Sequence, residues 1–349
     1  MTEGRLGVAV IGCGKVSQNV HLPALAKSRR CKLVAVCDAS SEVAHAVGRR
    51  YAIASVYDTV DAVLADDTVE AVIVAVGDPD HVQVALASIR AGKHVLVEKP
   101  LGMGVSECLP LRDAVRERGL KLQVGVMKRH DAGVEYARRA IRELIGPVVS
   151  FSAWYRASAD ELVDETSVFL PVLRDSNWQR PPYKLDREHY RLATHGAHLF
   201  DGIHWLVGES ADVQALHASR DGNDSWHGLL RLRVGGLGHF ELTVYIQSEW
   251  SEGVDVFGEA GTVSIRSENP FVLRPSRVRV SVASSGETVE PTFPVGDPYL
   301  RQLDAFAESV AEDRPVRADI DDGIMALELI DAVRASAQSG GARVELVHA

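Results

Sequence analysis

The stretch LGVAVIGCGKVS, residues 6–17, indicates the fold of the chain. An apolar run rich in Val leads directly into the pattern GxGxxS, and a helical stretch follows. Gly12 permits a tight turn, Gly14 lets the backbone approach a pyrophosphate, and the small Ser17 lets the helix pack closely on the strand. This pattern predicts a turn that binds the phosphates of a dinucleotide.

Two neighbouring features strengthen this prediction. Lys15 and Val16 stand in the first turn of the helix, where free N–H groups face phosphate oxygens. Asp38 ends the next apolar strand, at the distance along the chain where a carboxylate accepts both ribose hydroxyls of NAD. Because Asp38 also repels a 2′-phosphate and no Arg follows it immediately, the sequence favours NAD over NADP. The simpler alternative is that Asp38 only caps a turn.

The first third of the chain alternates short Val-rich runs with amphipathic stretches. This order is typical of a parallel sheet built from βαβ units, and strands that are apolar on both faces fit a sheet covered by helices on both sides. The expected strands are residues 6–12, 32–38, 70–76, 94–99 and 121–126.

The pattern changes after a helix predicted over residues 131–146, which ends at Gly146 before Pro147. Apolar and polar residues then alternate, as in an antiparallel sheet with one wet face. The segments with this pattern are residues 148–158, 213–220, 227–234, 238–246 and 253–266. Two helices, near 297–313 and 320–341, close the chain.

We therefore expect two domains in an α/β protein, as the length of 349 residues also suggests. A doubly wound Rossmann domain is predicted over residues 1–128, and an α/β domain with a large open, mostly antiparallel sheet over residues 129–349. The closing helix, about residues 320–339, is a candidate to pack back on the Rossmann domain.

Composition excludes several classes of function. The formal net charge is −10 without a basic face or tail, so nucleic acid is a poor partner. The start of the sequence lacks an export signal and no apolar run is long enough to span a membrane, so we expect a cytoplasmic protein without a membrane partner. The four cysteines form no CxxC pair, and reduced, buried thiols are the expected state.

A second motif, Glu98-Lys99-Pro100, ends the fifth strand. The carboxyl ends of strands in a doubly wound sheet are where ligands bind, so Lys99 is expected to face the ligand cleft. We count Glu98 and Lys99 among the candidate cofactor contacts for the same reason.

Four motifs together resemble the Gfo/Idh/MocA oxidoreductases, the family of glucose-fructose oxidoreductase and inositol dehydrogenase. They are GxGxxS at 12–17, AGKHVLVEKP at 91–100, VGVMKRHDAG at 125–133 and HLFDGIHWLVG at 198–208. The resemblance spans nearly the whole chain. It implies a Rossmann domain, a second α/β domain whose open sheet often makes a dimer or tetramer, and an active site between the two domains.

The resemblance also implies roles for single residues. His198 matches the family's catalytic histidine, and a neutral imidazole accepts a hydroxyl proton as hydride leaves the same carbon. Lys99 matches the lysine that approaches the reacting hydroxyl, where a cation stabilises a developing alkoxide, and its bond to Pro100 is commonly cis. His81 stands where family members place a residue beside the dinucleotide, although it equally suits a helix cap.

One position departs from the family pattern. Inositol dehydrogenase-like members carry an Asp one helical turn before the catalytic histidine, and this chain has Thr194 there. A hydroxyl can still orient the imidazole, or a nearby loop can bring a carboxylate. The loop candidates are Asp160, Glu161, Asp164, Glu165 and Asp186.

Other candidates have both a functional and a structural interpretation. His195 and His204 lie on opposite sides of the predicted helix and cannot bind one metal ion, so we expect no metal site here. His195 is instead a candidate substrate contact. Asp201 either holds His198 or a substrate hydroxyl, or makes a polar contact within the helix. Arg129 is either a donor to substrate or part of a surface salt bridge. Aromatic rings pack on the C–H faces of sugars, and Tyr155 and Trp250 are the favoured examples.

The long irregular stretch over residues 157–193 is the least regular part of the chain. Its carboxylates suit a lid over a polyhydroxylated or cationic ligand such as an aminoglycoside, although a solvated surface loop is the simpler interpretation.

The sequence as a whole predicts hydride transfer between NAD and a secondary ring hydroxyl of a sugar, cyclitol or (amino)glycoside. The same chemistry run backwards is that of a ketosugar reductase. An NAD-retaining glycoside hydrolase or lyase and a non-catalytic dinucleotide-binding sensor stay open as alternatives.

Overall fold

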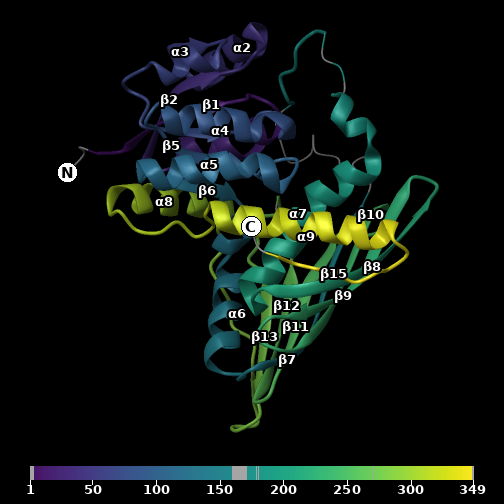
Figure 1. Ribbon diagram of the computed structural model, residues 1–349. Coiled ribbons are helices and arrows are strands. Elements are labelled where there is room, and N and C mark those ends of the chain that lie inside the picture. The colour runs from purple at the N-terminus through teal and green to yellow at the C-terminus, as the bar shows by residue number, and fades with distance from the viewer. Residues whose placement is uncertain (1–3, 159–170, 178, 180, 270, 348–349) are drawn as a thin grey trace. The chain divides into compact units, whose positions relative to one another are not determined.

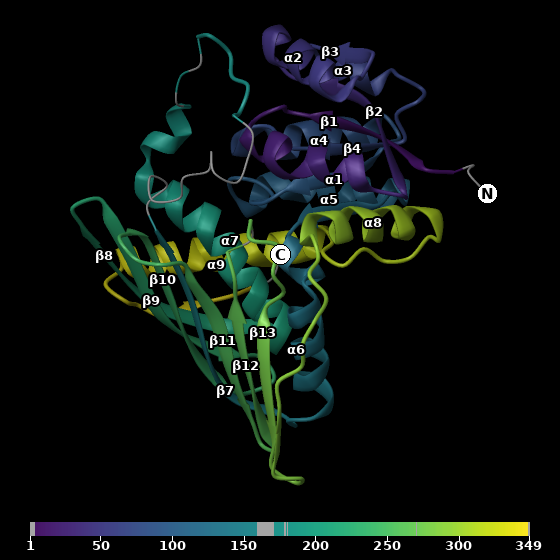
Figure 2. The same cartoon turned by 180° about the vertical axis from the view of Figure 1, so that it is seen from behind.

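The computed structural model describes residues 4–158, 171–177, 179, 181–269 and 271–347 (Figures 1 and 2). The chain divides into two compact units. The first comprises Met1–Val126, Thr166–Lys184 and Tyr299–Ile324, and the second Met127–Glu165, Leu185–Pro298 and Met325–Ala349. Two segments from the later part of the sequence therefore pack with the N-terminal unit.

The first unit is a Rossmann fold. In its described residues, parallel strands form one sheet in the order β3-β2-β1-β4-β5-β6, which is the dinucleotide-binding strand order. The strands are β1 (Leu6–Ile11), β2 (Cys31–Cys37), β3 (Ser55–Tyr57), β4 (Ala71–Val74), β5 (His94–Glu98) and β6 (Leu122–Gly125). Five of them confirm the predicted strands. The sequence missed β3, because three half-buried residues give no recognisable period.

Helices connect these strands and cover the sheet (Figures 1 and 2). They are η1 (Ser17–His21), α1 (Leu22–Lys27), α2 (Ser41–Tyr51), α3 (Val60–Leu64), η2 (Asp78–Asp80), α4 (His81–Arg90) and α5 (Val105–Arg118). Strands β1 and β4 are buried along their whole length, as their unbroken apolar sequences require.

The C-terminal part of the chain adds α8 (Pro298–Ala311) to this unit. The Gln123 amide donates to the carbonyl of Gln302 at 3.4 Å, and the N–H of Val124 donates to the carbonyl of Ala318 at 2.9 Å. Helix α9 (Ile320–Gln338) begins against the same unit, where an added Cβ on Gly323 would lie 2.9 Å from Val124.

The second unit is built on a large mixed sheet. Its order in the described residues is β14-β13-β12-β11-β7-β10-β9-β8-β15. Strand β10 runs parallel to β7 and the other neighbours are antiparallel, which confirms the mostly antiparallel sheet. The strands are β7 (Val148–Ser158), β8 (Ser210–Arg220), β9 (Asn223–Leu232), β10 (Leu237–Ile246), β11 (Ser251–Gly258), β12 (Gly261–Ser267), β13 (Arg277–Val282), β14 (Glu287–Val289) and β15 (Val344–Glu345).

Helices cover one face of this sheet. Helix α6 (Ala132–Glu143) lies on β12 and β13, and α7 (Arg187–Val207) lies on β7, β9 and β10. Two short helical turns, η3 (Met127–His130) and η6 (Pro182–Leu185), precede α6 and α7. Along β7, Phe151, Ala153, Tyr155 and Ala157 are buried, while the residues between them are more exposed. This alternation places Tyr155 on the covered face.

The four cysteines are buried thiols, as predicted, and none of them forms a disulfide. Cys31 and Cys37 stand at opposite ends of β2, too far apart to form a disulfide. Burial raises the pKa of Cys13 and Cys31 to about 12, so these thiols are unreactive. Within the described parts of the chain, no helix combines the length and apolarity needed to cross a bilayer.

Candidate active site

The glycine turn after β1 has the geometry that the sequence predicted. Gly12 has a φ of +91°, and a Cβ there would lie 2.4 Å from the carbonyl oxygen of Ala75. Ser17 is fully buried and its hydroxyl donates to the carbonyl of Gly12. A Cβ on Gly14 would meet no atom within 4 Å, so the backbone at this position faces open space. Lys15 and Val16 are exposed at the start of the helix.

Asp38 lies beside this turn, directly after β2. One carboxylate oxygen accepts the N–H of Cys13 at 2.7 Å, and the other accepts the N–H of Ser40 at 2.9 Å. The carboxylate is thus held at the carboxyl edge of the sheet, next to the glycine turn. A dinucleotide requires an open turn for its pyrophosphate and a neighbouring carboxylate that accepts its ribose hydroxyls, so Gly12, Gly14 and Asp38 fit this cofactor.

The end of β5 is fixed by buried hydrogen bonds. Glu98 contacts His21 Nε2 at 2.8 Å and accepts the N–H of Lys99 at 3.2 Å. Burial alone would raise the pKa of Glu98, but the His21 hydrogen bond and neighbouring cations hold it below its usual range. The Lys99–Pro100 peptide is cis, and His81 Nδ1 lies 2.7 Å from the carbonyl oxygen of Pro100. Glu98 and His81 therefore hold the backbone that carries Lys99.

The second unit gathers aromatic and basic side chains around Tyr155. Its hydroxyl lies 3.2 Å from His195 Nδ1, and its ring is stacked parallel to that of His198 with centres 6.2 Å apart. The Trp250 ring meets Tyr155 edge-on at 4.9 Å. The structure thus brings together four predicted residues from β7, from α7 and from the segment just before β11.

Lys128 joins this group, although the sequence pointed to its neighbour Arg129 instead. Its ammonium lies 5.6 Å from the ring centre of Tyr155 and 5.5 Å from that of Trp250, and it forms an ion pair with Glu252. Burial lowers the pKa of Lys128 to about 7, while the charge of Asp131 opposes this shift and the touching Glu252 carboxylate also favours the charged form. We call Lys128, Tyr155, His195, His198 and Trp250 the aromatic cluster.

Trp250 contributes a polar atom to this cluster. Its indole N–H is buried and has no hydrogen-bond partner among the described residues. A buried donor without an acceptor is costly, and a ligand oxygen beside the ring would satisfy it.

Arg129 and Asp201 form a buried ion pair. The guanidinium donates to the carboxylate through Nε at 3.1 Å and through Nη2 at 2.6 Å, and both side chains are at most 5% exposed. Arg129 also stacks on Trp205, with 4.4 Å between the guanidinium carbon and the ring centre. This geometry ties the segment after β6 to α7. Arg129 therefore forms a salt bridge, as one of its two expected roles required, but this salt bridge is buried and not at the surface.

The candidates for orienting His198 are placed differently. Thr194 is half-buried on α7, one turn before His198. Asp186 caps the amino end of α7 by accepting the N–H of His189 at 3.3 Å. The other loop carboxylates, Asp160, Glu161, Asp164 and Glu165, lie outside the described residues.

Tyr245 is a further contact that the sequence did not reveal. It has a φ of +65° at an irregularity in the pairing of β10 with β7, and its ring lies 6.1 Å from that of His195. The strained backbone re-aims this side chain, which regular alternation along β10 does not predict. Lys128, in contrast, stands in the VGVMKRHDAG motif, which had already marked this segment as part of the candidate site.

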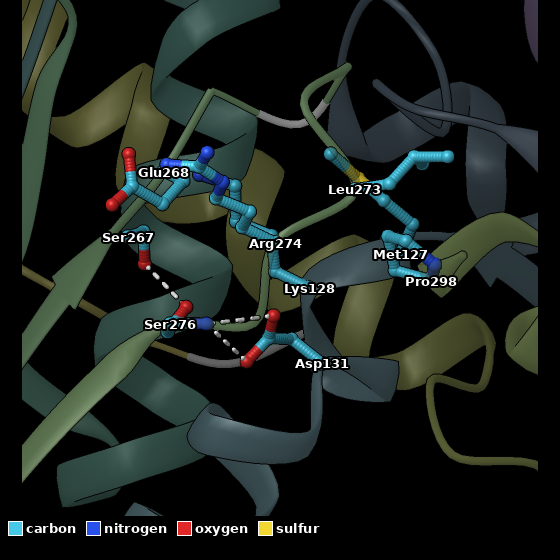
Figure 3. A pocket seen from close by; sticks show the side chains of 9 residues that line it. All are labelled: Met127, Lys128, Asp131, Ser267, Glu268, Leu273, Arg274, Ser276 and Pro298. Atoms are coloured by element: carbon cyan, nitrogen blue, oxygen red, sulfur yellow. Dashed lines mark hydrogen bonds between the residues drawn. The ribbon is translucent and has the colours of Figure 1, made fainter. Parts of the chain in front are cut away.

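A small pocket opens beside Lys128 in the same unit (Figure 3). The Asp131 carboxylate accepts the N–H of Ser276 at 3.1 Å and caps α6 by accepting the N–H of Val134 at 3.0 Å. Glu268 and Arg274 line one side of the pocket and Met127, Leu273 and Pro298 the other (Figure 3). Within the described chain, His, Cys, Asp and Glu form no group of three or more that could hold a metal ion.

The first unit therefore has the features of a dinucleotide-binding oxidoreductase domain. Residues 6–126 match the oxidoreductase family with an NAD-binding Rossmann fold, Gfo/Idh/MocA, and residues 145–346 match the C-terminal α/β domain of the same family. The chain belongs to the Gfo/Idh/MocA oxidoreductase family, and it is an NAD(P)-dependent dehydrogenase.

Relatives match over nearly the full chain. D-xylose 1-dehydrogenase (NADP(+)) 2 of Haloferax volcanii is 26% identical over 99% of this chain and 100% of its own length. Inositol 2-dehydrogenase of Rubrobacter xylanophilus is 27% identical over 96% of this chain and 92% of its own length. A solved levoglucosan dehydrogenase in complex with NADH shares the fold, with a TM-score of 0.83 and 20% identity over 99% of this chain and 100% of the other.

Proposed function

We propose that this protein oxidises a secondary ring hydroxyl of a sugar, cyclitol or (amino)glycoside and transfers the hydride to NAD. The aromatic cluster carries this proposal. It offers ring faces for the C–H surface of a sugar, and it offers His195, Lys128 and the Trp250 N–H as polar partners for hydroxyls. The names of relatives that act on xylose, inositol and levoglucosan support the same substrate class.

His198 is proposed as the base. Its ring lies parallel to that of the buried Tyr155, with the ring centres 6.2 Å apart, and a neutral imidazole accepts the hydroxyl proton while hydride leaves the same carbon. Lys99 is proposed to stabilise the developing alkoxide as a cation. Bound NAD supplies the hydride acceptor.

We infer that Gly12, Gly14, Lys15, Val16 and Ser17 bind the pyrophosphate, and that Asp38 binds the ribose and favours NAD over NADP. Both cofactors occur among the relatives: one carries NADP(+) in its name and a solved neighbour contains NADH. The fixed Asp38 carboxylate, which a 2′-phosphate would face, supports NAD.

We further propose that the protein forms a homo-oligomer through the uncovered face of the large sheet. Leu229 of β9 and Leu237 of β10 are 60% and 61% exposed there, while Leu230 and Gly238, the next residues along these strands, are buried. Light scattering coupled to size-exclusion chromatography measures the subunit count, and a monomer at all concentrations contradicts this proposal.

The decisive experiment is a screen of NAD reduction, followed by NADH absorbance, across polyols, hexoses, glycosides and amino sugars. We expect turnover with at least one class, and His198→Ala should lower kcat by about 10²–10⁴-fold because the general base is lost. His189→Ala is the matched control, since His189 lies on the opposite side of the same helix and contacts Arg334.

Three outcomes separate the candidates. Absence of NADH formation with every substrate contradicts the proposed NAD-dependent oxidation and favours the ketosugar reductase or the sensor. Conversion of a glycoside without stoichiometric NADH points to the NAD-retaining hydrolase or lyase. Equal rates for His198→Ala and wild type contradict only the assignment of His198 as the base and leave the proposed reaction unchanged.

A further inference from the structure

A short segment of the long insertion packs with the Rossmann unit. Residues 171–177 follow β7 in the sequence, yet they belong to the same compact unit as β1 and β2. We call Pro171–Asn177 the strap. Its described contacts are with Gln18 in the helical turn after the glycine motif, with Ser40 just after β2, and with Glu42 and Arg50 of α2. Gln18 and Ser40 follow the carboxyl ends of β1 and β2, the edge where dinucleotides bind in this fold.

Gln18 anchors the strap beside the glycine turn. Its side-chain oxygen accepts the N–H of Leu173 and its amide donates to the carbonyl of Leu173, both at 2.9 Å. The same amide donates to the carbonyl of Cys13 at 2.7 Å. Arg50 donates to Gln18 at 3.3 Å and to the carbonyl of Pro171 at 3.4 Å. A buried side chain thus links both backbone groups of Leu173 to the glycine turn.

Asp175 lies at the ribose end of this edge. The hydroxyl of Ser40 donates to the Asp175 carboxylate at 2.5 Å, while the N–H of Ser40 donates to Asp38 at 2.9 Å. One residue therefore connects the two carboxylates. The Ser40 hydrogen bond and the N–H of Asn177 hold the pKa of Asp175 below its usual range, so it is charged at neutral pH.

We propose that Asp175 is a second specificity-determining carboxylate in the ribose pocket, which excludes the 2′-phosphate of NADP. This inference rests on the proposed NAD-dependent function and adds a residue from the insertion to it. Asp175 acts in two ways. Its charge repels a phosphate near Asp38, and it accepts the hydrogen bond of the Ser40 hydroxyl, which is then not available to a phosphate oxygen.

The insertion then carries a role that the sequence did not indicate. Its carboxylates suggested a lid for a cationic substrate, whereas the described contacts direct one of them toward the cofactor edge. Tyr183, farther along the insertion, lies against Gly77 after β4, where an added Cβ would be 3.5 Å from its hydroxyl oxygen. The strap and Tyr183 both line the carboxyl edge of the Rossmann sheet.

The test is a fluorescence titration of the full-length protein with NADH and with NADPH, which needs no substrate or turnover. Asp175→Asn keeps the size of the side chain and removes its charge. We expect it to lower the ratio of the NADPH Kd to the NADH Kd by about tenfold, because one charge repulsion at short range is removed. Asp175→Glu keeps the charge and should keep the ratio within about twofold of wild type.

Asp67→Asn is the matched control, since Asp67 is exposed and precedes β4, at the opposite edge of the sheet. It loses the same charge and should leave the ratio unchanged. Thermal unfolding verifies that each variant is folded. If wild type prefers NADH and Asp175→Asn behaves like Asp67→Asn, this inference is wrong while the proposed function stands. If wild type prefers NADPH, the proposed cofactor is wrong and the inference falls with it.

Discussion

The dinucleotide turn of the first unit and the aromatic cluster of the second are built by different means. The turn depends on the backbone: Gly12 adopts a positive φ against Ala75, and Gly14 leaves space above the chain. The cluster depends on side chains that β7, α7 and the segment before β11 contribute from distant parts of the sequence. A backbone site leaves a local pattern in the sequence, whereas a side-chain site leaves only scattered residues.

The strongest test of this contrast is a pair of glycine substitutions. Gly12→Ala should destabilise the protein by about 2–6 kcal/mol, because Ala at this φ is strained and its Cβ would overlap the Ala75 carbonyl. Gly14→Ala should change stability by less than about 0.5 kcal/mol, since its Cβ meets no atom within 4 Å.

Urea unfolding measures the two stabilities, and NADH fluorescence measures the affinities. We expect Gly14→Ala to weaken NADH binding roughly tenfold in spite of its normal stability, as the loss of one or two backbone contacts would. Unchanged NADH affinity in Gly14→Ala would show that the dinucleotide does not approach the chain at this turn.

The same contrast explains how far the sequence could predict the structure. The strands of the Rossmann sheet and the end of β5 followed from apolar runs and glycine positions, because burial on both faces imposes an unbroken apolar pattern. The pairing of β10 with β7 is parallel and could not be predicted, since alternation along a strand sets its faces but not its neighbours.

Site residues differ in the same way. Tyr155, His195, His198 and Trp250 were named from the sequence, but their mutual contacts depend on the sheet register and on the position of α7. Lys128 and Arg129 are neighbours with opposite placements, one in the cluster and one buried against Asp201. Both residues lie in the short helical turn η3, which points their side chains in different directions. No residue pattern in the motif shows which of the two enters the cluster.

The buried pair of Arg129 and Asp201 gives the next largest expected effect. Arg129→Ala should cost about 3–5 kcal/mol of stability, because it leaves the Asp201 charge buried without a partner. Arg116→Ala is the matched control: its ion pair with Asp321 is 59% and 44% exposed, and its loss should cost at most about 1 kcal/mol.

Urea denaturation of both variants checks this prediction. If Arg129 instead serves as a substrate donor, Arg129→Ala will keep nearly normal stability and raise KM. That result would show that Arg129 contacts substrate and would contradict its role as a structural ion pair.

Glu98 provides a pH-dependent test in the Rossmann unit. Its pKa is held below the ordinary value of 4.5, so its contribution to stability is complete above about pH 4.5 and disappears as pH falls through the lowered pKa. At pH 7, Glu98→Gln should cost about 1.5–3 kcal/mol, the range for a hydrogen bond to a charged group.

Unfolding free energies of wild type and Glu98→Gln, measured between pH 3 and pH 7, should converge at the acidic end. A difference that stays constant across this range would mean that Glu98 is not charged in the folded protein. Its effect would then come from packing alone.

The smallest expected effect concerns the indole N–H of Trp250. Trp250→Phe keeps an aromatic ring against Tyr155 but removes a buried donor that has no partner among the described residues. We expect KM for the sugar or cyclitol substrate to rise about three- to tenfold with kcat little changed, as the loss of one neutral hydrogen bond to substrate requires.

Trp226→Phe makes the same chemical change outside the cluster. The Trp226 indole is fully buried, stacks on His217 and likewise has no partner for its N–H among the described residues. Because no ligand oxygen is expected there, KM should stay at the wild-type value even if stability falls. Equal KM values for the two variants would indicate that the Trp250 N–H makes no contact with substrate. The cluster would then recognise its ligand through ring faces and through His195 and Lys128.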